Sequence, residues 1–266
     1  MIVVKAGGRA LQSNMDGILR DVSSKAGRGV VFVHGGGDIV TRYERMMGIE
    51  PKFVVSPQGI RSRLTTLEEM DVYNMVMSGK LNKEIVARIH GLGVNAVGLS
   101  GVDGALLRAK RKEKIVIVDE RGRRRAIEGG YTGRITDVNT KLLETLTSTG
   151  YVVVVAPVAL GYRMELLNVD ADQAASAIAG AVKAEKLIIL SDVDGVIVDG
   201  DLVKILKPSE AERLQPKIGV GMNRKLMMCV RSVREGVGEA IISSGLIENP
   251  IDAAMKGAGT HIVSED

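Results

Sequence analysis

A buried strand that runs directly into three consecutive glycines constrains the fold of this chain more than any other feature. Residues 30–33 are apolar, His34 follows, and Gly35–Gly37 then precede Asp38 and a helical pattern over residues 38–47. This order predicts a strand, a glycine turn and a helix. Backbone without Cβ atoms can approach a ligand closely, and its N–H groups favour phosphate or carboxylate oxygens. A single glycine would be enough for the turn, so the triplet favours a ligand site.

Apolar stretches typical of buried strands alternate with helical patterns along most of the chain. We expect strands at residues 2–5, 30–34, 95–100, 151–156, 187–190, 240–243 and 260–263. We expect helices at residues 13–25, 38–47, 66–92, 139–149, 171–183, 209–214 and 222–235, with Gly79 and Asn82 as breaks in the third. The alternation predicts an α/β fold, a three-layer α/β/α sandwich with a mainly parallel central sheet. Two lobes, residues 1–160 and 161–266, would share this sheet.

Three segments depart from the alternation. Residues 51–60 and 196–205 are expected to form hairpins, the second around Gly200. Residues 106–137 alternate in polarity, are strongly charged and contain four glycines, which predicts an insertion of two or three antiparallel strands.

Composition excludes several classes of protein. No apolar run approaches the roughly 20 residues of a membrane helix, and Cys229 is the only cysteine, so no internal disulfide can form. The net charge of +4 is modest, and aromatic residues make up only 3% of the chain, which disfavours nucleic acid as a partner. These features predict a cytoplasmic protein that binds neither membrane nor nucleic acid.

In a parallel sheet, ligands lie beyond the carboxyl ends of the strands. This rule places four segments along one rim: Lys5–Gly8, His34–Gly37, Ser100–Gly101 and Ser191–Gly195. Lys5 follows a buried strand beside two glycines, where its charge suits a phosphate, although a lysine at the surface end of a strand is an equal alternative.

Further polar motifs flank predicted helices. Arg61 and Arg63 would project to one side of an extended segment, as carboxylate ligands or as solvated charge. Asn168, Asp170 and Asp172 open a helix, and one of the first two could serve only as its N-cap. Gly219–Lys225 is a second glycine loop before a helix.

In that second loop, a lysine near the positive end of the helix dipole implies a negative charge nearby. Lys225 is this lysine. Cys229 and His34 are better explained by packing than by chemistry, and no cysteine–histidine cluster indicates zinc.

Taken together and in chain order, these motifs resemble the amino acid kinase family. They are Lys5-Ala-Gly-Gly8, His34-Gly-Gly-Gly37, Arg63-Leu-Thr65, Asn168-Val-Asp-Ala-Asp172, Ser191-Asp-Val-Asp-Gly195 and Gly221-Met-Asn-Arg-Lys225. The chain is most similar to the acetylglutamate kinase branch. Ser56–Arg63 and Glu128–Gly133 make it more similar still to archaeal kinases that phosphorylate aminoadipate or glutamate attached to a small amino-group carrier protein.

The resemblance implies transfer of phosphate from ATP to a side-chain carboxylate, with Mg²⁺ carried on the nucleotide and no metal site in the protein. It implies that Lys5 and Lys225 stabilise the transferring phosphoryl group and that Asp172 orients both. Substrate binding falls to Gly35, Gly36, Arg63 and Asn168. Nucleotide binding falls to Gly7, Gly8, Ser191, Asp192, Asp194, Gly195, Gly219 and Gly221. Asp170 departs from the family, because acetylglutamate kinases often have Asn there.

A basic insertion would suit an acidic carrier protein. The candidate contacts are Lys110, Arg111, Lys112, Arg123, Arg124 and Arg125. A solvated hairpin is an equal alternative.

No extra helix precedes Met1, and in this respect the chain resembles the dimeric, uninhibited members of the family, so we expect a homodimer. Free N-acetylglutamate kinase is the nearest rival activity, and a non-catalytic sensor on the same sheet is the rival from another class.

Overall fold

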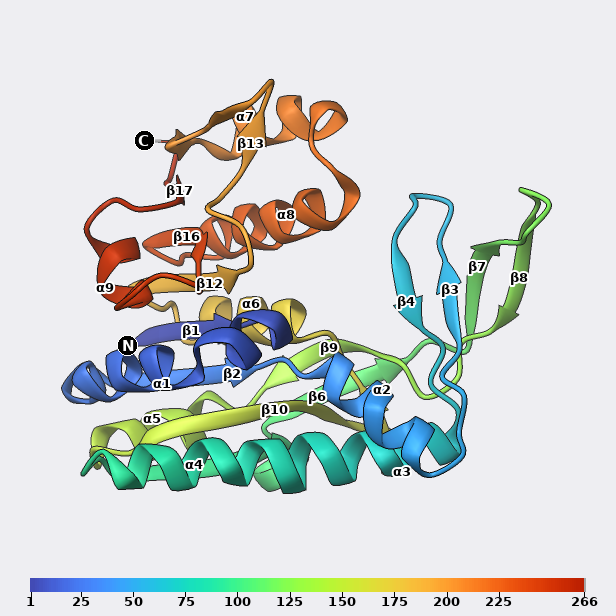
Figure 1. The fold of residues 1–266 in the computed structure, drawn as a ribbon, viewed down its shortest axis with the longest axis horizontal. Coiled ribbons are helices and arrows are strands. Elements are labelled where there is room, and N and C mark those ends of the chain that lie inside the picture. Colours follow the sequence, from blue (N-terminus) through green and yellow to red (C-terminus); the bar gives the residue numbers. More distant parts are fainter. Residues whose placement is uncertain (266) are drawn as a thin grey trace.

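A large twisted sheet organises the computed structural model, which describes residues 1–265 (Figure 1). Within these residues its strands follow the order β15-β17-β16-β12-β1-β2-β10-β6-β9, and β5 and β11 also pair with β10. The central strands are β1 (Ile2–Ala6), β2 (Val30–His34), β5 (Ala96–Gly101), β10 (Val152–Gly161), β12 (Lys186–Ser191) and β16 (Glu239–Ser244). Their pairings with one another are all parallel. The predicted mainly parallel sheet is confirmed.

The central strands are apolar on both faces because helices cover both. Val3, Val31 and Val153 belong to one buried cluster, whereas the alternate residues Val4 and Phe32 belong to the other. Continuous apolar runs such as that of β10 are typical of strands covered on both sides. The strands therefore form the middle of three layers.

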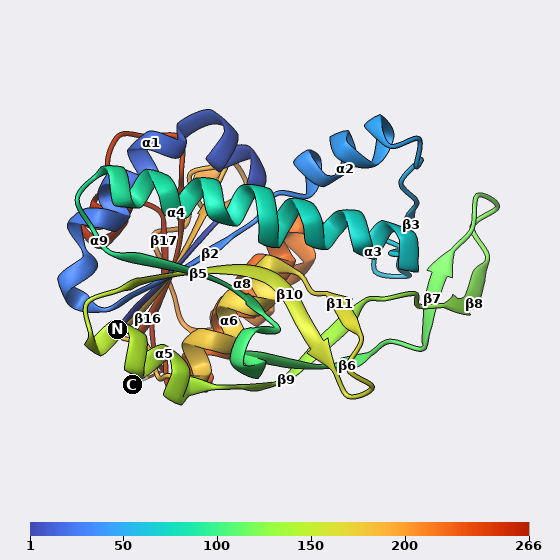
Figure 2. The same cartoon turned by 90° about the horizontal axis from the view of Figure 1, so that it is seen from below.

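Two sets of helices make the outer layers, as Figure 2 shows. One layer contains α1 (Gly8–Ser24), α4 (Asn82–Gly91) and α9 (Pro250–Met255), with α2 (Gly37–Met46) and α3 (Leu67–Asn74) alongside. The other contains α5 (Thr140–Ser148), α6 (Ala171–Ala181), α7 (Pro208–Leu214) and α8 (Val220–Arg234). The three-layer sandwich is thus confirmed.

A separate small sheet projects from one end of this sandwich (Figure 1). Its order is β4-β3-β7-β8, from β3 (Phe53–Val55), β4 (Arg61–Arg63), β7 (Lys114–Val118) and β8 (Arg124–Glu128). The insertion contains four strands rather than two or three, because β6 (Leu107–Arg111) and β9 (Gly133–Val138) pair with each other at the edge of the main sheet. Residues 53–63 and the insertion thus meet in one sheet.

The first helix begins earlier than the sequence pattern indicates. We expected it at residue 13, but α1 starts at Gly8, directly after β1, and is kinked at Asn14. The Asn14 side chain donates to the carbonyls of Gly245 and Ile247, which accounts for its non-helical conformation. The amides of the Gly7–Gly8 turn are therefore those of a helix N-terminus.

The expected break at Gly79 and Asn82 is wrong. A π-helical segment, η2 (Met75–Leu81), continues α3 into α4 without interruption. A π-helical turn contains about one residue more than an α-helical turn, so the helix continues without a break. Such segments often occur beside functional sites.

The remaining elements lie towards the C-terminus, apart from short 3-10 turns. A small hairpin of β13 (Ile197–Val198) and β14 (Asp201–Leu202) confirms the turn at Gly200. Strands β15 (Ile205–Leu206) and β17 (Thr260–Ile262) extend the main sheet, and β11 (Leu166–Asn168) pairs with β10. The sequence pattern missed β11 and α9, which are short. Across residues 1–265, the helices are all too short or too polar to cross a membrane.

Candidate active site

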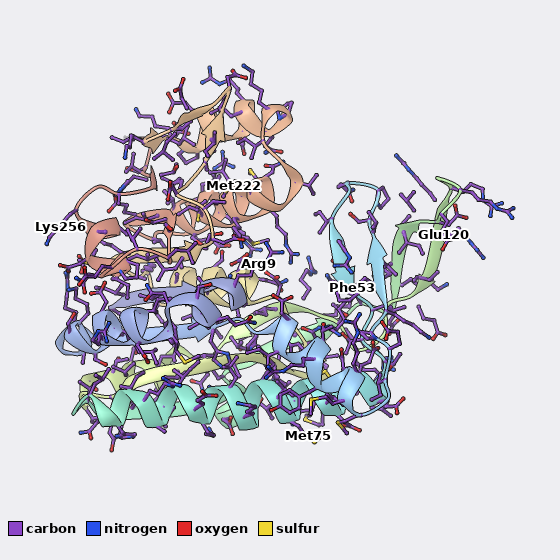
Figure 3. The ribbon with its side chains drawn as sticks, in the orientation of Figure 1. Arg9, Phe53, Met75, Glu120, Met222 and Lys256 are labelled. Atoms are coloured by element: carbon purple, nitrogen blue, oxygen red, sulfur yellow. The ribbon has the colours of Figure 1, made fainter. Side chains whose placement is uncertain are left out.

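One large pocket of about 630 Å³ lies beyond the carboxyl ends of β1, β2 and β12, between the main sheet and the small sheet. Its walls come from the Gly7–Gly8 turn, the Gly35–Gly37 loop, the N-terminal end of α6, the second turn of α8, and the small sheet. Figure 3 shows Arg9 of α1 and Phe53 of β3 on opposite sides of this space. The predicted rim is confirmed for Lys5–Gly8 and Gly35–Gly37. Ser100 and Gly101 do not line the pocket, and Ser100 instead donates to Asp103.

Two lysines from opposite ends of the chain share one carboxylate at the floor of the pocket. Lys5 Nζ lies 2.7 Å from Asp172 Oδ1, and Lys225 Nζ lies 2.6 Å from Asp172 Oδ2. Lys5 is 5% exposed and Asp172 is 6% exposed. The structure thus brings together the three residues predicted as catalytic.

Burial and charge act in opposite directions on this cluster. Burial alone would raise the pKa of Asp172, but the charges and hydrogen bonds of Lys5 and Lys225 more than offset it and hold that pKa well below its usual range. Burial would lower the pKa of Lys225, yet Asp172 raises it. Asp172 is therefore ionised and Lys225 is protonated near neutral pH. With two lysines around one carboxylate, the cluster has a formal excess of one positive charge.

The position of Lys225 differs in one respect from our expectation. Helix α8 begins at Val220, so Lys225 lies in its second turn, where the helix dipole is weaker than in the first. The negative charge expected near it is nevertheless present as Asp172, on the first turn of α6.

Glycines form a cradle beside the two lysines. A Cβ atom on Gly35 would lie 3.0 Å from the amide nitrogen of Gly8, and one on Gly36 would lie 2.6 Å from a Leu81 methyl and 2.9 Å from the Met77 sulfur. A side chain at Gly35 would press against the Gly8 backbone, whereas one at Gly36 would have to displace the ends of Leu81 and Met77. The amides of Gly8 and Gly37 open α1 and α2, so two helix N-termini point towards the pocket.

The π-helical segment and the buried His34 lie next to this cradle on the side of the protein core. Met77 lines the pocket and packs with Leu81 against Gly36. Burial lowers the pKa of the His34 imidazole to about 4, so the ring is neutral. His34 Nε2 lies 3.3 Å from the amide nitrogen of Asn82, which also donates to the carbonyl of Val154. The structural interpretation of His34 is favoured, because the ring lies in the core.

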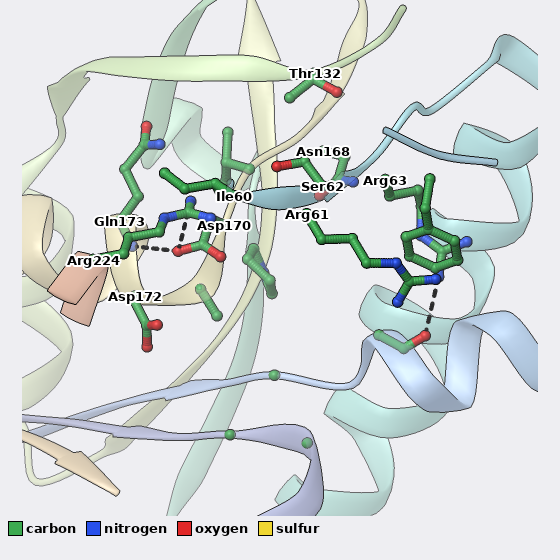
Figure 4. A pocket seen from close by; sticks show the side chains of 18 of the residues that line it. Ile60, Arg61, Ser62, Arg63, Thr132, Asn168, Asp170, Asp172, Gln173 and Arg224 are labelled. Atoms are coloured by element: carbon green, nitrogen blue, oxygen red, sulfur yellow. Dashed lines mark hydrogen bonds and ion pairs between the residues drawn. The ribbon is translucent and has the colours of Figure 1, made fainter. Parts of the chain in front are cut away.

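Arg63 lines the pocket but already has a buried partner. Its guanidinium pairs with the fully buried carboxylate of Glu44 and donates to Thr41 Oγ1 at 2.6 Å and to the Gly37 carbonyl at 3.1 Å. Arg61 lies over the ring of Phe53, 3.8 Å from its centroid. Both arginines lie at one end of the pocket, while Asp172 and Arg224 lie at the other (Figure 4).

Asn168 ties the pocket wall to the loop between β4 and α3. Its side chain donates to Thr65 Oγ1 at 2.9 Å, and its main-chain N–H donates to the carbonyl of Tyr131. Asn168 also lines the pocket.

The predicted nucleotide-binding residues divide into two groups. Gly7, Gly8, Ser191 and Asp192 line the pocket, and Asp192 pairs with Arg9 at 2.9 Å. The other predicted residues lie outside its lining: Asp194, Gly195, Gly219 and Gly221. Gly219 precedes α8 as its N-cap.

Sequence reasoning missed several residues of the pocket. Arg224 lies 3.3 Å from Asp170 Oδ1, and Tyr73 reaches the pocket from α3. Lys112, which we expected only on a docking surface, also lines it. Arg224 precedes Lys225 directly, and that adjacency was the one available signal.

Some of the predicted minor roles are borne out by contacts. Asp170 is the N-cap of α6, because its Oδ1 accepts from the N–H of Gln173 at 3.1 Å. Cys229 is fully buried.

The chain matches a known family of proteins. The family model described as "Amino acid kinase family" matches residues 1–244, and the chain belongs to this family. Among individual proteins, the LysW-aminoadipate/LysW-glutamate kinases of Saccharolobus islandicus and Saccharolobus solfataricus are each 50% identical over 265 residues, covering 99% of this chain and 100% of the relative.

Solved structures support the fold at lower identity. The N-acetylglutamate synthase of Neisseria gonorrhoeae, complexed with coenzyme A and N-acetyl-glutamate, aligns with a TM-score of 0.79 at 24% identity, over 100% of this chain and 59% of that one. The carbamate kinase of Giardia lamblia bound to AMP-PNP aligns with a TM-score of 0.68 at 16% identity, over 99% and 98%.

Proposed function

We propose that this protein transfers the terminal phosphoryl group of ATP to the side-chain carboxylate of 2-aminoadipate or glutamate carried on a small acidic amino-group carrier protein. The observation that carries the proposal is the buried Lys5–Asp172–Lys225 cluster beside a glycine cradle. The identity to LysW-aminoadipate/LysW-glutamate kinases supports the choice of substrate.

The reaction needs positive charge more than it needs a base. A side-chain carboxylate, with an ordinary pKa near 4.3, is already ionised and can attack the phosphorus directly. What opposes the reaction is repulsion between two anions and the charge on the moving phosphoryl group. Lys5 and Lys225 would offset that charge, and Asp172 would hold both ammonium groups towards it.

Amides would bind the flanking phosphates and the attacking carboxylate. We assign the amides of Gly7 and Gly8 to the nucleotide phosphates and those of Gly35 and Gly36 to the acceptor. The lack of side chains at Gly35 and Gly36 supports this, because it leaves the amides open to a ligand. Bound Mg²⁺ would ride on the ATP phosphates and neutralise part of their charge.

The two lobes would divide the substrates between them. Residues 1–160 would provide most of the acyl-amino acid site, with Arg63 near the unreactive end of that substrate and Asn168 added from the other lobe. Residues 161–266 would bind ATP near Ser191 and Asp192, together with the amides of Gly7 and Gly8. Since Glu44 neutralises Arg63, we expect Arg63 to contribute hydrogen bonds more than net charge.

The basic hairpin is the proposed docking surface for the carrier. Arg124 and Arg125 on β8 are exposed, as is Lys110 on the preceding strand β6. The hairpin β7–β8 stands clear of the main sheet with Glu120 near its tip (Figure 3). Arg111 is a weaker candidate, because it stacks 4.0 Å from the centre of the Tyr131 ring and donates to the Gly130 carbonyl. Arg123 pairs with Asp119.

A phosphorylation assay tests the proposal. Purified protein, ATP and Mg²⁺ would be given carrier-linked glutamate, carrier-linked aminoadipate or free N-acetylglutamate. We expect phosphate transfer to at least one carrier-linked substrate with a kcat/KM far above that for N-acetylglutamate. Preference for N-acetylglutamate would instead indicate the free-substrate activity, and no transfer to any of the three would refute a kinase acting on these acids.

A further inference from the structure

A second group of charges lines the pocket next to the lysine–aspartate cluster. Arg224 Nη2 lies 3.3 Å from Asp170 Oδ1. Lys112, in the turn between β6 and β7, is only partly exposed and lines the same pocket. Within residues 1–265 its ammonium group has neither a hydrogen bond nor an ion pair, although its main-chain N–H donates to the Thr132 carbonyl.

The charges of this group do not cancel. Two cations, Lys112 and Arg224, face one carboxylate, and Asp170 also caps α6 through the N–H of Gln173. Burial lowers the pKa of Lys112, and the nearby charge of Arg224 lowers it further, while Asp170 opposes both. A partly buried ammonium group without a partner is costly, and an anionic ligand would remove that cost.

The arrangement repeats that of the first cluster. Lys5, Asp172 and Lys225 also place two cations around one carboxylate, with one excess positive charge in the pocket. The two aspartates are two residues apart, and the arginine and lysine of α8 are adjacent. The first cluster therefore provides one excess positive charge for the phosphoryl group. The second group provides another excess positive charge, which the proposed transfer does not use.

We propose that Lys112 and Arg224 bind a second carboxylate, one that is not phosphorylated, when the acceptor substrate enters the pocket. This inference rests on the proposed function. Lys112 directly precedes the small sheet in the chain, and Ile115 and Ile117 of that sheet line the same pocket, which favours the acceptor over the nucleotide. The carboxylate is either the amino acid's own α-carboxylate or an acidic group of the carrier beside the linkage.

This assignment also gives Asp170 a purpose beyond capping. Its carboxylate holds Arg224 in the pocket wall and limits the excess charge to one unit. Asn would keep the cap and remove the negative charge, because Asn and Asp are equally good N-caps. Asp170→Asn should therefore bind the acceptor as tightly as the wild type or more tightly.

The test compares Lys112→Met with Lys141→Met, a matched change at an exposed lysine on α5 that lies outside the pocket. We expect Lys112→Met to raise the KM for carrier-linked glutamate about tenfold or more, because a charge-assisted hydrogen bond is lost. The kcat and the KM for ATP should change little, and Lys112→Arg should recover part of the loss. Lys141→Met should match the wild type, and thermal unfolding should show that all variants fold.

Binding of free N-acetylglutamate, measured by calorimetry with ADP present, separates the two sources of the carboxylate. A weaker affinity in Lys112→Met would identify the amino acid's α-carboxylate. An unchanged affinity, with the KM for carrier-linked glutamate still raised, would identify the carrier. An unchanged affinity and an unchanged KM would overturn the inference, as would a rise confined to the KM for ATP.

The same measurements distinguish failure of the inference from failure of the proposed function. A wild type that transfers no phosphate to these acceptors refutes the function, and calorimetric binding of carrier-linked glutamate to wild type and Lys112→Met still tests the inference. A wild type that binds none of these ligands, or an Asp170→Asn variant that binds them far more weakly, would contradict it.

Discussion

The two sides of the pocket are built in opposite ways. On one side, Lys5 and Asp172 are almost fully buried, and they extend from a parallel strand and a helix of the central sandwich. On the other side, the small sheet exposes Arg124 and Arg125 to solvent and stands away from that sandwich. A charge in the first setting is fixed and poorly screened, whereas a charge in the second is mobile and screened by salt.

This difference matches the two tasks of the proposed reaction. Phosphoryl transfer needs groups held within a fraction of an ångström, which buried elements provide. Encounter with a carrier protein needs only long-range attraction, which exposed charges provide. Substitutions matched between buried and exposed positions should separate the two tasks.

The largest expected effect is on stability. Asp172→Asn leaves the buried Lys5 and the partly buried Lys225 without a counter-charge, so we expect the free energy of unfolding to fall by about 3–5 kcal/mol. Asp119→Asn removes a carboxylate that pairs with Arg123 on the exposed side and should have a much smaller effect. Denaturant titrations of both variants provide the measurement, and equal losses would erase the contrast between the two sides.

The next effect is on catalysis. Lys225→Ala should lower kcat by about 10²–10³-fold with little change in KM, because its charge acts on the transition state. Lys217→Ala, an exposed lysine that pairs with Asp199 just before α8, should leave both constants unchanged. Steady-state kinetics would decide, and a large rise in KM with normal kcat would contradict the assigned role.

A third effect concerns the buried support below the glycine cradle. The His34 pKa is about 4 in the folded protein and ordinarily 6.5, so between these values the unfolded chain binds a proton that the folded chain does not. This contribution to stability is full above pH 6.5 and is lost as the pH falls towards 4, by about 3 kcal/mol.

The variant His34→Gln isolates this contribution. Its unfolding free energy should lack that part of the pH dependence between about pH 4 and 6.5, while a change at the exposed His90 should keep it. Parallel pH profiles for wild type and His34→Gln would show that His34 is not neutralised by burial.

The smallest expected effect is on the encounter between the enzyme and the carrier protein. The KM for carrier-linked substrate should rise a few-fold between about 50 and 300 mM salt, and less steeply in a variant with Arg124→Ala and Arg125→Ala. The KM for free N-acetylglutamate should not share this dependence. A flat profile for the carrier-linked substrate would remove the docking surface from the account.

Much of the sandwich was predictable because strands that are buried on both faces have continuous apolar runs in their sequence. Val30–His34 and the triple glycine correctly located a strand, a turn and a helix N-terminus. The start of α1 was missed because Gly8 and the kink at Asn14 obscure its helical period. The π-helical segment was missed because one extra residue in a turn leaves no local sequence signal.

The candidate site was predictable only in part. Ordered motifs and the resemblance brought Lys5, Asp172 and Lys225 together, and the structure confirms that they meet. The pairing of Arg63 with Glu44 was not foreseeable from the sequence. Glu44 lies on a helix and Arg63 on a strand, and in the sequence both look like ordinary surface charges. In the sequence, Lys112 looked like part of a solvated hairpin. The pairing of β6 with β9 instead places Lys112 at the lining of the pocket.

The central claim is that Lys5 and Lys225 together stabilise a phosphoryl group in transit, and a transition-state analogue tests it most directly. Binding of ADP with aluminium fluoride and carrier-linked glutamate would be measured in the wild type and in Lys225→Ala, with ADP alone as the reference. We predict that the variant loses affinity for the analogue by about the same factor as its kcat, on the order of 10²-fold, and keeps its affinity for ADP. Equal affinity of both proteins for the analogue would contradict the claim.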